Sequence, residues 1–371
     1  MKNLKSILFL ITLLVVWPVT ELSAKGNIAG PEIAHKADAL MQQFFEDNNT
    51  PGLSVSVGLG GKLVWSQGYG YADLEQRVPV TPGLSKFRIG SVIKSMTADA
   101  VAQLFEQGKL DLDAPIQTYV PDFPEKQAPI SLRQLLGHLA GVRHYEGEEF
   151  MNHQHYETVT DGLAIFADDP LVAAPGEAFH YSSYGFNLIS AAIETASGED
   201  YLSYMNDHIF KPAGMKSTVP DLLFEIIPGR GRYYGIRDDQ IWNMPEVDNS
   251  YKWASGGFVG TSDDLVRYGM AQLSNSLVST DARRIFWTEQ ETSSGDSTGY
   301  ALGWRVSTDD KGQLWVGHGG GSVGGSTQFY IMPESGLVIA MISNLSGFDY
   351  GDVLIKLAEI FLRDAQIVSE E

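Results

Sequence analysis

A serine and a lysine three residues apart, Ser91 and Lys94, are the first residues in this chain whose types and spacing suggest chemistry. Gly90 precedes them, and an apolar-periodic stretch that ends near Gly108 follows, as is typical of a helix. Positions i and i+3 share one helix face, so the Ser91 hydroxyl and the Lys94 amine can converge. A nearby base activates a serine hydroxyl, and a lysine becomes such a base when burial or positive charge lowers its pKa. The spacing predicts an activated nucleophile at a helix start. A helix-capping serine with a solvated lysine is the alternative.

The elements that must position this pair follow from hydrophobic periodicity. An early helix is expected over residues 34–47, followed by two strands over residues 53–59 and 62–70. Helical patterns and loops dominate from 111 to 290, with helices expected over 132–138, 186–196 and 263–273. Strand patterns return over residues 300–307, 313–317, 326–332 and 337–343, before a final amphipathic helix over 354–362.

This order predicts one sheet closed by both ends of the chain, with a helical insertion. We expect an α/β domain formed by residues 30–107 and 291–364, and a helical domain with active-site loops over residues 108–290. A cleft between the two is the natural place for a ligand.

Charge and composition exclude some functions. The formal net charge is −20, which argues against nucleic-acid binding and against anionic membrane surfaces. The chain has no cysteine, so no disulfide can form and the core must hold the fold.

The first 24 residues have the pattern of a secretory signal peptide. Lys2 and Lys5 precede an apolar run, and Ala24 offers a cleavage point. This pattern predicts a periplasmic or secreted protein without stable membrane insertion after cleavage; an uncleaved N-terminal anchor is the alternative.

Several further motifs resemble the serine β-lactamase-like and penicillin-binding-protein superfamily, in which Ser-x-x-Lys is a signature. The resemblance is nearest the class C β-lactamase, D,D-peptidase and esterase branch. It covers about residues 30–364 and is carried by residues 87–94, 108–115, 130–138, 175–183 and 317–320. Residues 141–146 and 181–185 are most similar to the mitochondrial lactamase-like proteins and their bacterial relatives.

The resemblance implies a β-lactamase/transpeptidase-like fold, an antiparallel sheet flanked by helices with an inserted, mostly helical domain. It also implies the catalytic residues Ser91, Lys94 and Tyr181, with no metal or organic cofactor. Nearby cations would lower the pKa of the Tyr181 phenol, which would relay protons to the leaving group or activate the deacylating water. His138 is expected to be structural, holding a helix end against the next loop.

Four more positions are implied in substrate and oxyanion binding: Ser183, His318, Gly320 and Gly321. The backbone N–H groups of Ser91 and Gly321 would form the oxyanion hole. Ser183 stands where many relatives have asparagine, and His318 where class C lactamases have lysine. A neutral imidazole binds a carboxylate less well than an ammonium does, so we expect peptides or esters to be better substrates than β-lactams.

The sequence therefore predicts a serine hydrolase that acts through an acyl-enzyme on an amide or ester bond. Small esters, D-amino-acid peptides, peptidoglycan stems and β-lactams all remain candidate substrates, and the expected partner is a small molecule or peptide. The alternative is a non-catalytic or filament-forming scaffold that keeps the fold.

Overall fold

The computed structural model describes residues 29–369. The predicted signal peptide and its cleavage point near Ala24 lie outside the described residues. None of the helices between residues 29 and 369 is both long enough and apolar enough to cross a membrane.

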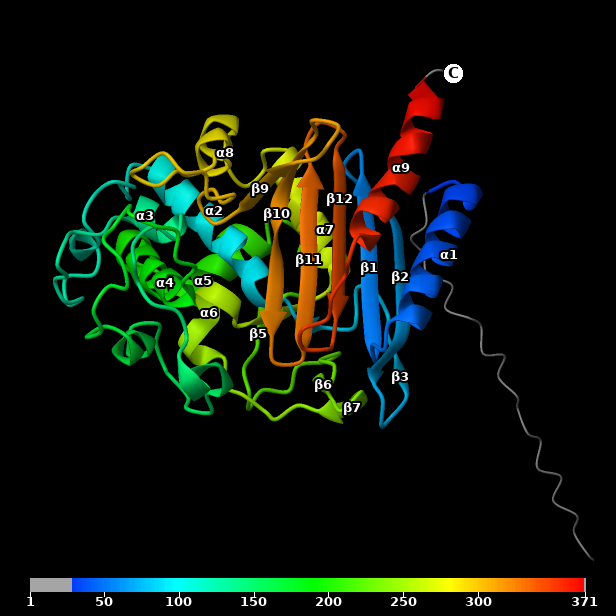
Figure 1. Ribbon diagram of the computed structural model, residues 1–371, viewed down its shortest axis with the longest axis horizontal. Helices are drawn as coiled ribbons and strands as arrows, with labels where there is room; N and C mark the ends of the chain where they lie inside the picture. The colour runs from blue at the N-terminus through cyan, green and yellow to red at the C-terminus, as the bar shows by residue number, and fades with distance from the viewer. Residues whose placement is uncertain (1–28, 370–371) are drawn as a thin grey trace, which may run out of the picture.

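A seven-stranded antiparallel sheet runs through the middle of the molecule, with the strand order β3-β2-β1-β12-β11-β10-β9 (Figure 1). Its strands are β1 (Gly52–Leu59), β2 (Lys62–Asp73), β3 (Val78–Pro79), β9 (Arg305–Thr308), β10 (Leu314–Ser322), β11 (Gly325–Met332) and β12 (Leu337–Ser343). Strand β1 pairs with β12, and Leu53 lies opposite Ser343. The two ends of the chain therefore close a single sheet, as the sequence predicted.

Both faces of this sheet are covered by helices. One face carries α1 (Pro31–Asp47) and α9 (Val353–Ser369), and the other carries α7 (Ser262–Leu273). Apolar side chains and serines alternate along β1, so the two kinds of side chain point to opposite faces of the sheet. The apolar side chains of β1 join the cluster under α1 and α9, namely Leu53, Val55 and Val57. Its serines face α7, where Ser54 Oγ and Ser56 Oγ each lie 2.7 Å from Ser262 Oγ.

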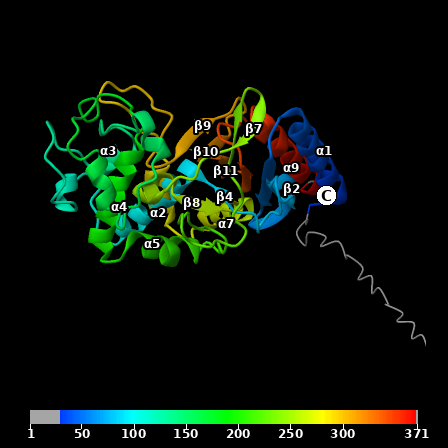
Figure 2. The same ribbon diagram turned by 90° about the horizontal axis from the view of Figure 1, so that it is seen from below.

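The second half of the molecule is a cluster of helices, which lies on the side of the sheet opposite α1 and α9 in both views (Figures 1 and 2). It contains α2 (Ile93–Glu106), α3 (Leu132–Leu136), α4 (Ser183–Ser197), α5 (Tyr201–Tyr204), α6 (Trp253–Gly256) and α8 (Thr280–Phe286). Short helical turns occur at η1 (Gly90–Val92), η2 (Ile116–Thr118), η3 (Gly147–Met151), η4 (Asp161–Ile165), η5 (Met205–Phe210) and η6 (Ser250–Lys252).

Two helices pack against elements of a different domain from the one to which the sequence analysis assigned them. Helix α7 packs on β1 and β12, although its residues fall within the predicted helical segment 108–290. Helix α2 packs against α4 and α6, although its residues fall within the predicted α/β segment 30–107. Periodicity identifies an element but not its packing partner, so these placements came only with the tertiary structure.

Some strands also differ from the expectation. The predicted strand over residues 300–307 is confined to β9, because Gly303 has a φ of +83° and packs against α2. A Cβ at Gly303 would lie 2.5 Å from the Ala98 Cβ. Five short strands outside the large sheet were not predicted: β4 (Phe87–Arg88), β5 (Val219–Pro220), β6 (Tyr234–Arg237), β7 (Gln240–Asn243) and β8 (Phe258–Gly260).

Candidate active site

Ser91 lies in the helical turn η1, which leads directly into α2. The preceding Gly90 has a φ of +54°, a conformation that favours glycine. A Cβ on Gly90 would lie 2.7 Å from the carbonyl oxygen and 2.8 Å from the nitrogen of Gly321 in β10. The missing side chain therefore lets the turn that carries Ser91 pack directly against the backbone of β10.

The Lys94 side chain is fully buried and reaches three acceptors. Its Nζ lies 3.1 Å from Ser91 Oγ, 3.1 Å from Ser183 Oγ and 2.8 Å from the carbonyl oxygen of Ser255. The predicted serine–lysine pair is thus within hydrogen-bonding distance. The other two partners come from α4 and α6, far away in the sequence.

The surroundings of Lys94 favour its neutral form. Burial lowers the pKa of its ammonium well below the usual value, and the positive charges of Lys252 and Arg305 lower it further. A neutral lysine amine has a free lone pair, so Lys94 can accept the Ser91 proton when the hydroxyl attacks.

Tyr181 lies just before α4 and faces this pair. Its ring centroid is 4.9 Å from Lys94 Nζ, and its phenol interacts with the Ser91 side chain. Burial raises the pKa of the phenol, and the opposing effects of Ser91 and Arg305 are smaller. The sequence-based expectation of a lowered phenol pKa is therefore wrong in direction. Tyr181 keeps its proton at neutral pH and can donate it.

Ser183 is buried and contacts Lys94 directly. The Tyr145 phenol interacts with the side chains of both Ser183 and Ser255, the two other partners of Lys94, and both interactions oppose the rise of its pKa on burial. Sequence reasoning missed Tyr145 and Ser255. Tyr145 lies in the segment 141–146, which was singled out only for its resemblance to relatives, and Ser255 contributes only its backbone carbonyl to Lys94. The role of Ser183 in substrate binding remains a prediction.

His318 is also buried, and both of its ring nitrogens are bonded within the protein. Its Nδ1 lies 2.5 Å from the Gly319 carbonyl oxygen, and its Nε2 lies 2.8 Å from the Tyr300 hydroxyl. A carbonyl accepts only, so Nδ1 carries the proton and Nε2 accepts from Tyr300. Burial and the Lys94 charge lower the pKa of His318 well below its usual value. Its imidazole is therefore neutral and has no N–H left to offer a ligand.

One edge of β10 is open beside Ser91. Strand β9 pairs with β10 only from Leu314 to Gly317, so the following residues have no strand partner on that side. A Cβ on Gly320 would lie 2.1 Å from the Ile89 carbonyl oxygen, whereas one on Gly321 would meet nothing within 4 Å. Gly320 thus packs against the segment before Ser91, and Gly321 faces open space. Their roles in oxyanion and substrate binding remain predictions.

Two further cations that sequence reasoning missed affect this site. Arg305, opposite Gly317 in β9, is exposed, and its guanidinium lies 6.0 Å from the centre of the Tyr300 ring. Lys252 is buried, and its ammonium lies over three aromatic rings. Among residues 29–369, neither forms an ion pair, and no three histidine or acidic side chains are grouped to hold a metal ion.

This fold and site define a protein of the β-lactamase and transpeptidase-like class. More specifically, the chain belongs to the β-lactamase family, whose sequence pattern it matches over residues 37–360. It is 31% identical to the human serine beta-lactamase-like protein LACTB, mitochondrial, over 88% of this chain and 79% of that protein.

Solved structures agree with this assignment. The octameric penicillin-binding protein homologue from Pyrococcus abyssi matches with a TM-score of 0.74 and 26% identity, over 91% of this chain and 77% of that one. The D-amino acid amidase from Ochrobactrum anthropi shares the fold, with a TM-score of 0.75 and 23% identity over 91% of this chain and 99% of that one. The family and its structural neighbours support a serine hydrolase that acts on amide or ester bonds.

Proposed function

We propose that this protein is a serine hydrolase that cleaves amide or ester bonds through a Ser91 acyl-enzyme. The observation that carries the proposal is the 3.1 Å contact between a buried Lys94 amine and the Ser91 hydroxyl. All three hydrogen-bonding partners of Lys94 are neutral oxygen atoms. A lysine in such surroundings is a base at neutral pH rather than one half of an ion pair.

The proposed reaction uses each group once in acylation. Lys94 accepts the Ser91 proton while Ser91 Oγ attacks the substrate carbonyl. The backbone N–H groups of Ser91 and Gly321 hold the oxyanion, and such donors each contribute about 3–4 kcal/mol to transition-state stabilisation. Tyr181 passes its phenolic proton to the leaving group and regains a proton from the Lys94 ammonium, so both groups return to their starting forms. Water then releases the acyl group.

Peptides and esters fit the site better than β-lactams do. His318 is neutral and internally bonded, so it offers no charge to the carboxylate that such lactams carry. Arg305 is exposed at the end of β9, next to the open edge of β10, and has no counter-ion among the described residues. We propose that Arg305 attracts the carboxylate of a peptide substrate, which an extended chain along β10 would bring towards it.

Covalent labelling tests the nucleophile. Wild-type protein and Ser91→Ala would be incubated with a fluorophosphonate probe and compared by intact-mass measurement. We expect one added probe on the wild type and none on the variant. Equal labelling of the two proteins, or no labelling of either, would contradict the proposal, and the second result would favour a non-catalytic scaffold.

A substrate panel tests the preference. p-Nitrophenyl esters, D-Ala-D-Ala peptides and nitrocefin would be compared on wild type, Arg305→Met and His318→Lys. We expect Arg305→Met to raise KM for the peptides but not for uncharged esters, and His318→Lys to improve nitrocefin hydrolysis. Nitrocefin as the best wild-type substrate would contradict the proposed preference.

A further inference from the structure

His138, which is not among the proposed catalytic residues, forms hydrogen bonds with the residues on both sides of Tyr181. The backbone N–H of His180 donates to the carbonyl oxygen of His138 at 2.8 Å. The backbone N–H of Ser182 donates to the Nδ1 atom of the same histidine at 3.1 Å. His138 therefore binds the residue before Tyr181 and the residue after it, which fixes the path of the backbone between them.

The His138 ring also packs on the tyrosine itself. The two ring centroids are 4.3 Å apart, and only 2% of His138 is exposed. His138 follows α3 with a φ of +58°, a left-handed conformation that is uncommon for residues other than glycine. A strained backbone persists only where its surroundings enforce it, and such positions concentrate at active sites.

A second histidine repeats the contact one residue further along. The backbone N–H of Ser183 donates to His144 Nδ1 at 3.2 Å, and the His144 ring meets Tyr181 edge-on with centroids 5.5 Å apart. These two N–H groups belong to the N-cap residue and the first residue of α4, where no intrahelical acceptor exists. The two imidazoles supply acceptors in place of water.

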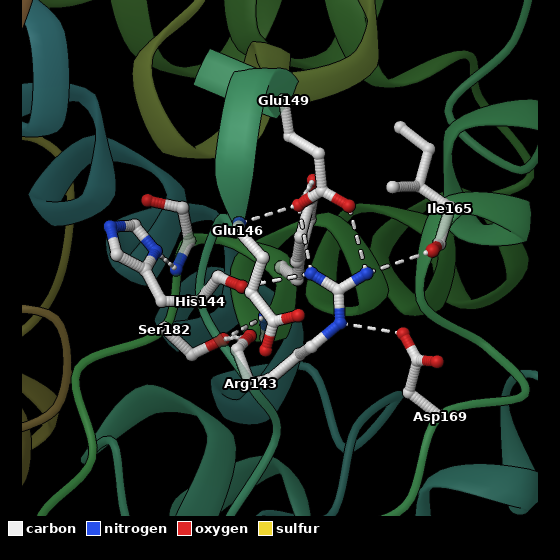
Figure 3. A network of polar contacts seen from close by, with 10 residues as sticks. Arg143, His144, Glu146, Glu149, Ile165, Asp169 and Ser182 are labelled. Atoms are coloured by element: carbon white, nitrogen blue, oxygen red, sulfur yellow. Dashed lines mark hydrogen bonds and ion pairs between the residues drawn. The ribbon is translucent and has the colours of Figure 1, made fainter.

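The loop that carries His144 is itself held firmly (Figure 3). The Arg143 guanidinium donates to Glu149 at 2.8 Å and to Asp169 at 2.5 Å. The Arg143 carbonyl oxygen accepts from the Ser182 hydroxyl at 2.7 Å. Arg143 therefore links its ion pairs with Glu149 and Asp169 to Ser182, which lies in the segment that both histidines contact.

We propose that His138 and His144 are positioning residues, which hold the segment 181–183 so that the Tyr181 phenol and the Ser183 hydroxyl stay on Ser91 and Lys94. The inference rests on the proposed role of Tyr181 and extends it to the groups that aim it. Both imidazoles must be neutral, because each Nδ1 accepts a hydrogen bond. Burial and the Lys94 charge lower the pKa of both, that of His144 to about 4.

A matched pair of substitutions separates the two functions of His138. An asparagine side chain can place an acceptor where Nδ1 lies and tolerates a positive φ, whereas a glutamine side chain reaches the position of Nε2 instead. With p-nitrophenyl butyrate, we expect His138→Gln to lower kcat about 10²-fold with KM little changed, as misplacement of a catalytic group does. We expect His138→Asn to lower kcat by a clearly smaller factor than His138→Gln does.

A double-mutant cycle shows whether the loss acts through Tyr181. In a Tyr181→Phe background the phenol is already gone, so His138→Gln should lower kcat less than threefold further. A loss that stays near 10²-fold in that background would overturn the proposal, because a general structural defect would add to the first change.

A second readout does not depend on turnover. With 3-fluorotyrosine at position 181, we expect one ¹⁹F resonance in the wild type, a broadened or split one in His138→Gln and a single one in His138→Asn. Identical spectra for all three would overturn the positioning role. A wild type without activity but with the expected spectra would refute the proposed function alone. If His138→Gln does not fold, His144→Gln and His144→Asn make the same comparison at Ser183.

Discussion

Two buried cations six residues apart in the chain have opposite surroundings. Arg88 donates to Asp221 at 2.6 Å and to the Val323 carbonyl oxygen at 2.7 Å, and its guanidinium lies 3.6 Å from the centre of the Tyr233 ring. Lys94 is equally buried, but all of its partners are neutral oxygen atoms, and the nearby charges are positive.

The difference separates a structural cation from a proposed catalytic one. The pKa of the Arg88 guanidinium is raised, with Asp221 among the causes, whereas that of Lys94 is lowered. A buried charge without a partner is costly, so an amine in that position gives up its proton. The same depth of burial therefore gives a permanent ion pair at one end of this short segment and a base at the other.

The largest expected effect comes from Lys94. Lys94→Met removes the proposed base and should lower kcat/KM for an ester by about 10²–10⁴-fold, while stability to urea stays equal or rises. Lys94→Arg is the matched control, since an arginine keeps its proton and should be as inactive as the methionine variant. An active Lys94→Arg enzyme would show that Lys94 does not act as a base.

The second-largest effect is expected at Asp221, the ion-pair partner of Arg88. Asp221→Asn leaves the guanidinium buried without a carboxylate, which should lower the free energy of unfolding by about 3–5 kcal/mol. Urea denaturation measures this loss. Asp113→Asn, which breaks an exposed pair with Arg133, is the control and should cost about 1 kcal/mol or less. Equal losses in the two variants would mean that burial does not distinguish the pairs.

Lys252 sharpens the comparison. It is buried and forms no ion pair among the described residues, and burial lowers its pKa to about 7 although Asp221 acts in the opposite direction. The folded-state pKa lies below the unfolded one. The loss of folding stability caused by the buried charge is therefore complete below about pH 7 and fades as the pH rises towards 10. Lys252→Met should therefore raise the free energy of unfolding at pH 6 by about 1–4 kcal/mol.

The same change should also affect catalysis. Removing the Lys252 charge raises the pKa of Lys94, so the acid limb of the pH profile of kcat/KM should move to higher pH. Lys109→Met, in the exposed loop that follows α2, should change neither the stability at pH 6 nor the position of the acid limb. An unmoved acid limb in Lys252→Met would mean that the two ammonium groups are electrostatically independent.

The smallest expected effect extends the comparison to a buried acid. Burial raises the pKa of Asp99 to about 7, and its carboxylate accepts hydrogen bonds from Tyr268 and Gln272. The folded-state pKa lies above the unfolded one, so this contribution to stability is present below about pH 4 and is lost as the pH rises to 7.

Asp99→Asn removes that titration. Between pH 5 and pH 7 the wild type should lose up to roughly 1.4 kcal/mol of stability per pH unit relative to the variant. Urea denaturation at pH 5, 6, 7 and 8 measures the difference, which should become constant above pH 8. A difference that does not change with pH would show that Asp99 is ionised throughout.

Local patterns were enough to predict a large part of the fold. The alternation in β1 and the apolar run in β12 are visible in the chain, and the i, i+3 spacing of Ser91 and Lys94 brings the two side chains together. The short strands β4, β5 and β8 were not predictable, because each depends on a partner far away in the sequence. Strands β6 and β7 pair with each other in a local hairpin, which the sequence analysis missed. Tyr145, Ser255 and Lys252 were missed at the site for a related reason. Their relevance to the site follows only from tertiary contacts with Lys94 or its partners, which the sequence does not show.

The amino-acid sequence by itself determined the family, the closure of the sheet by the two ends of the chain, and the pairing of Ser91, the proposed nucleophile, with the neighbouring Lys94 amine. The tertiary structure alone decided the protonation states around them. Burial holds the proton on Tyr181, where the sequence suggested the reverse, and internal hydrogen bonds use both nitrogens of His318. A pKa depends on desolvation and on charges brought close by folding, and neither is a property of the order of residues.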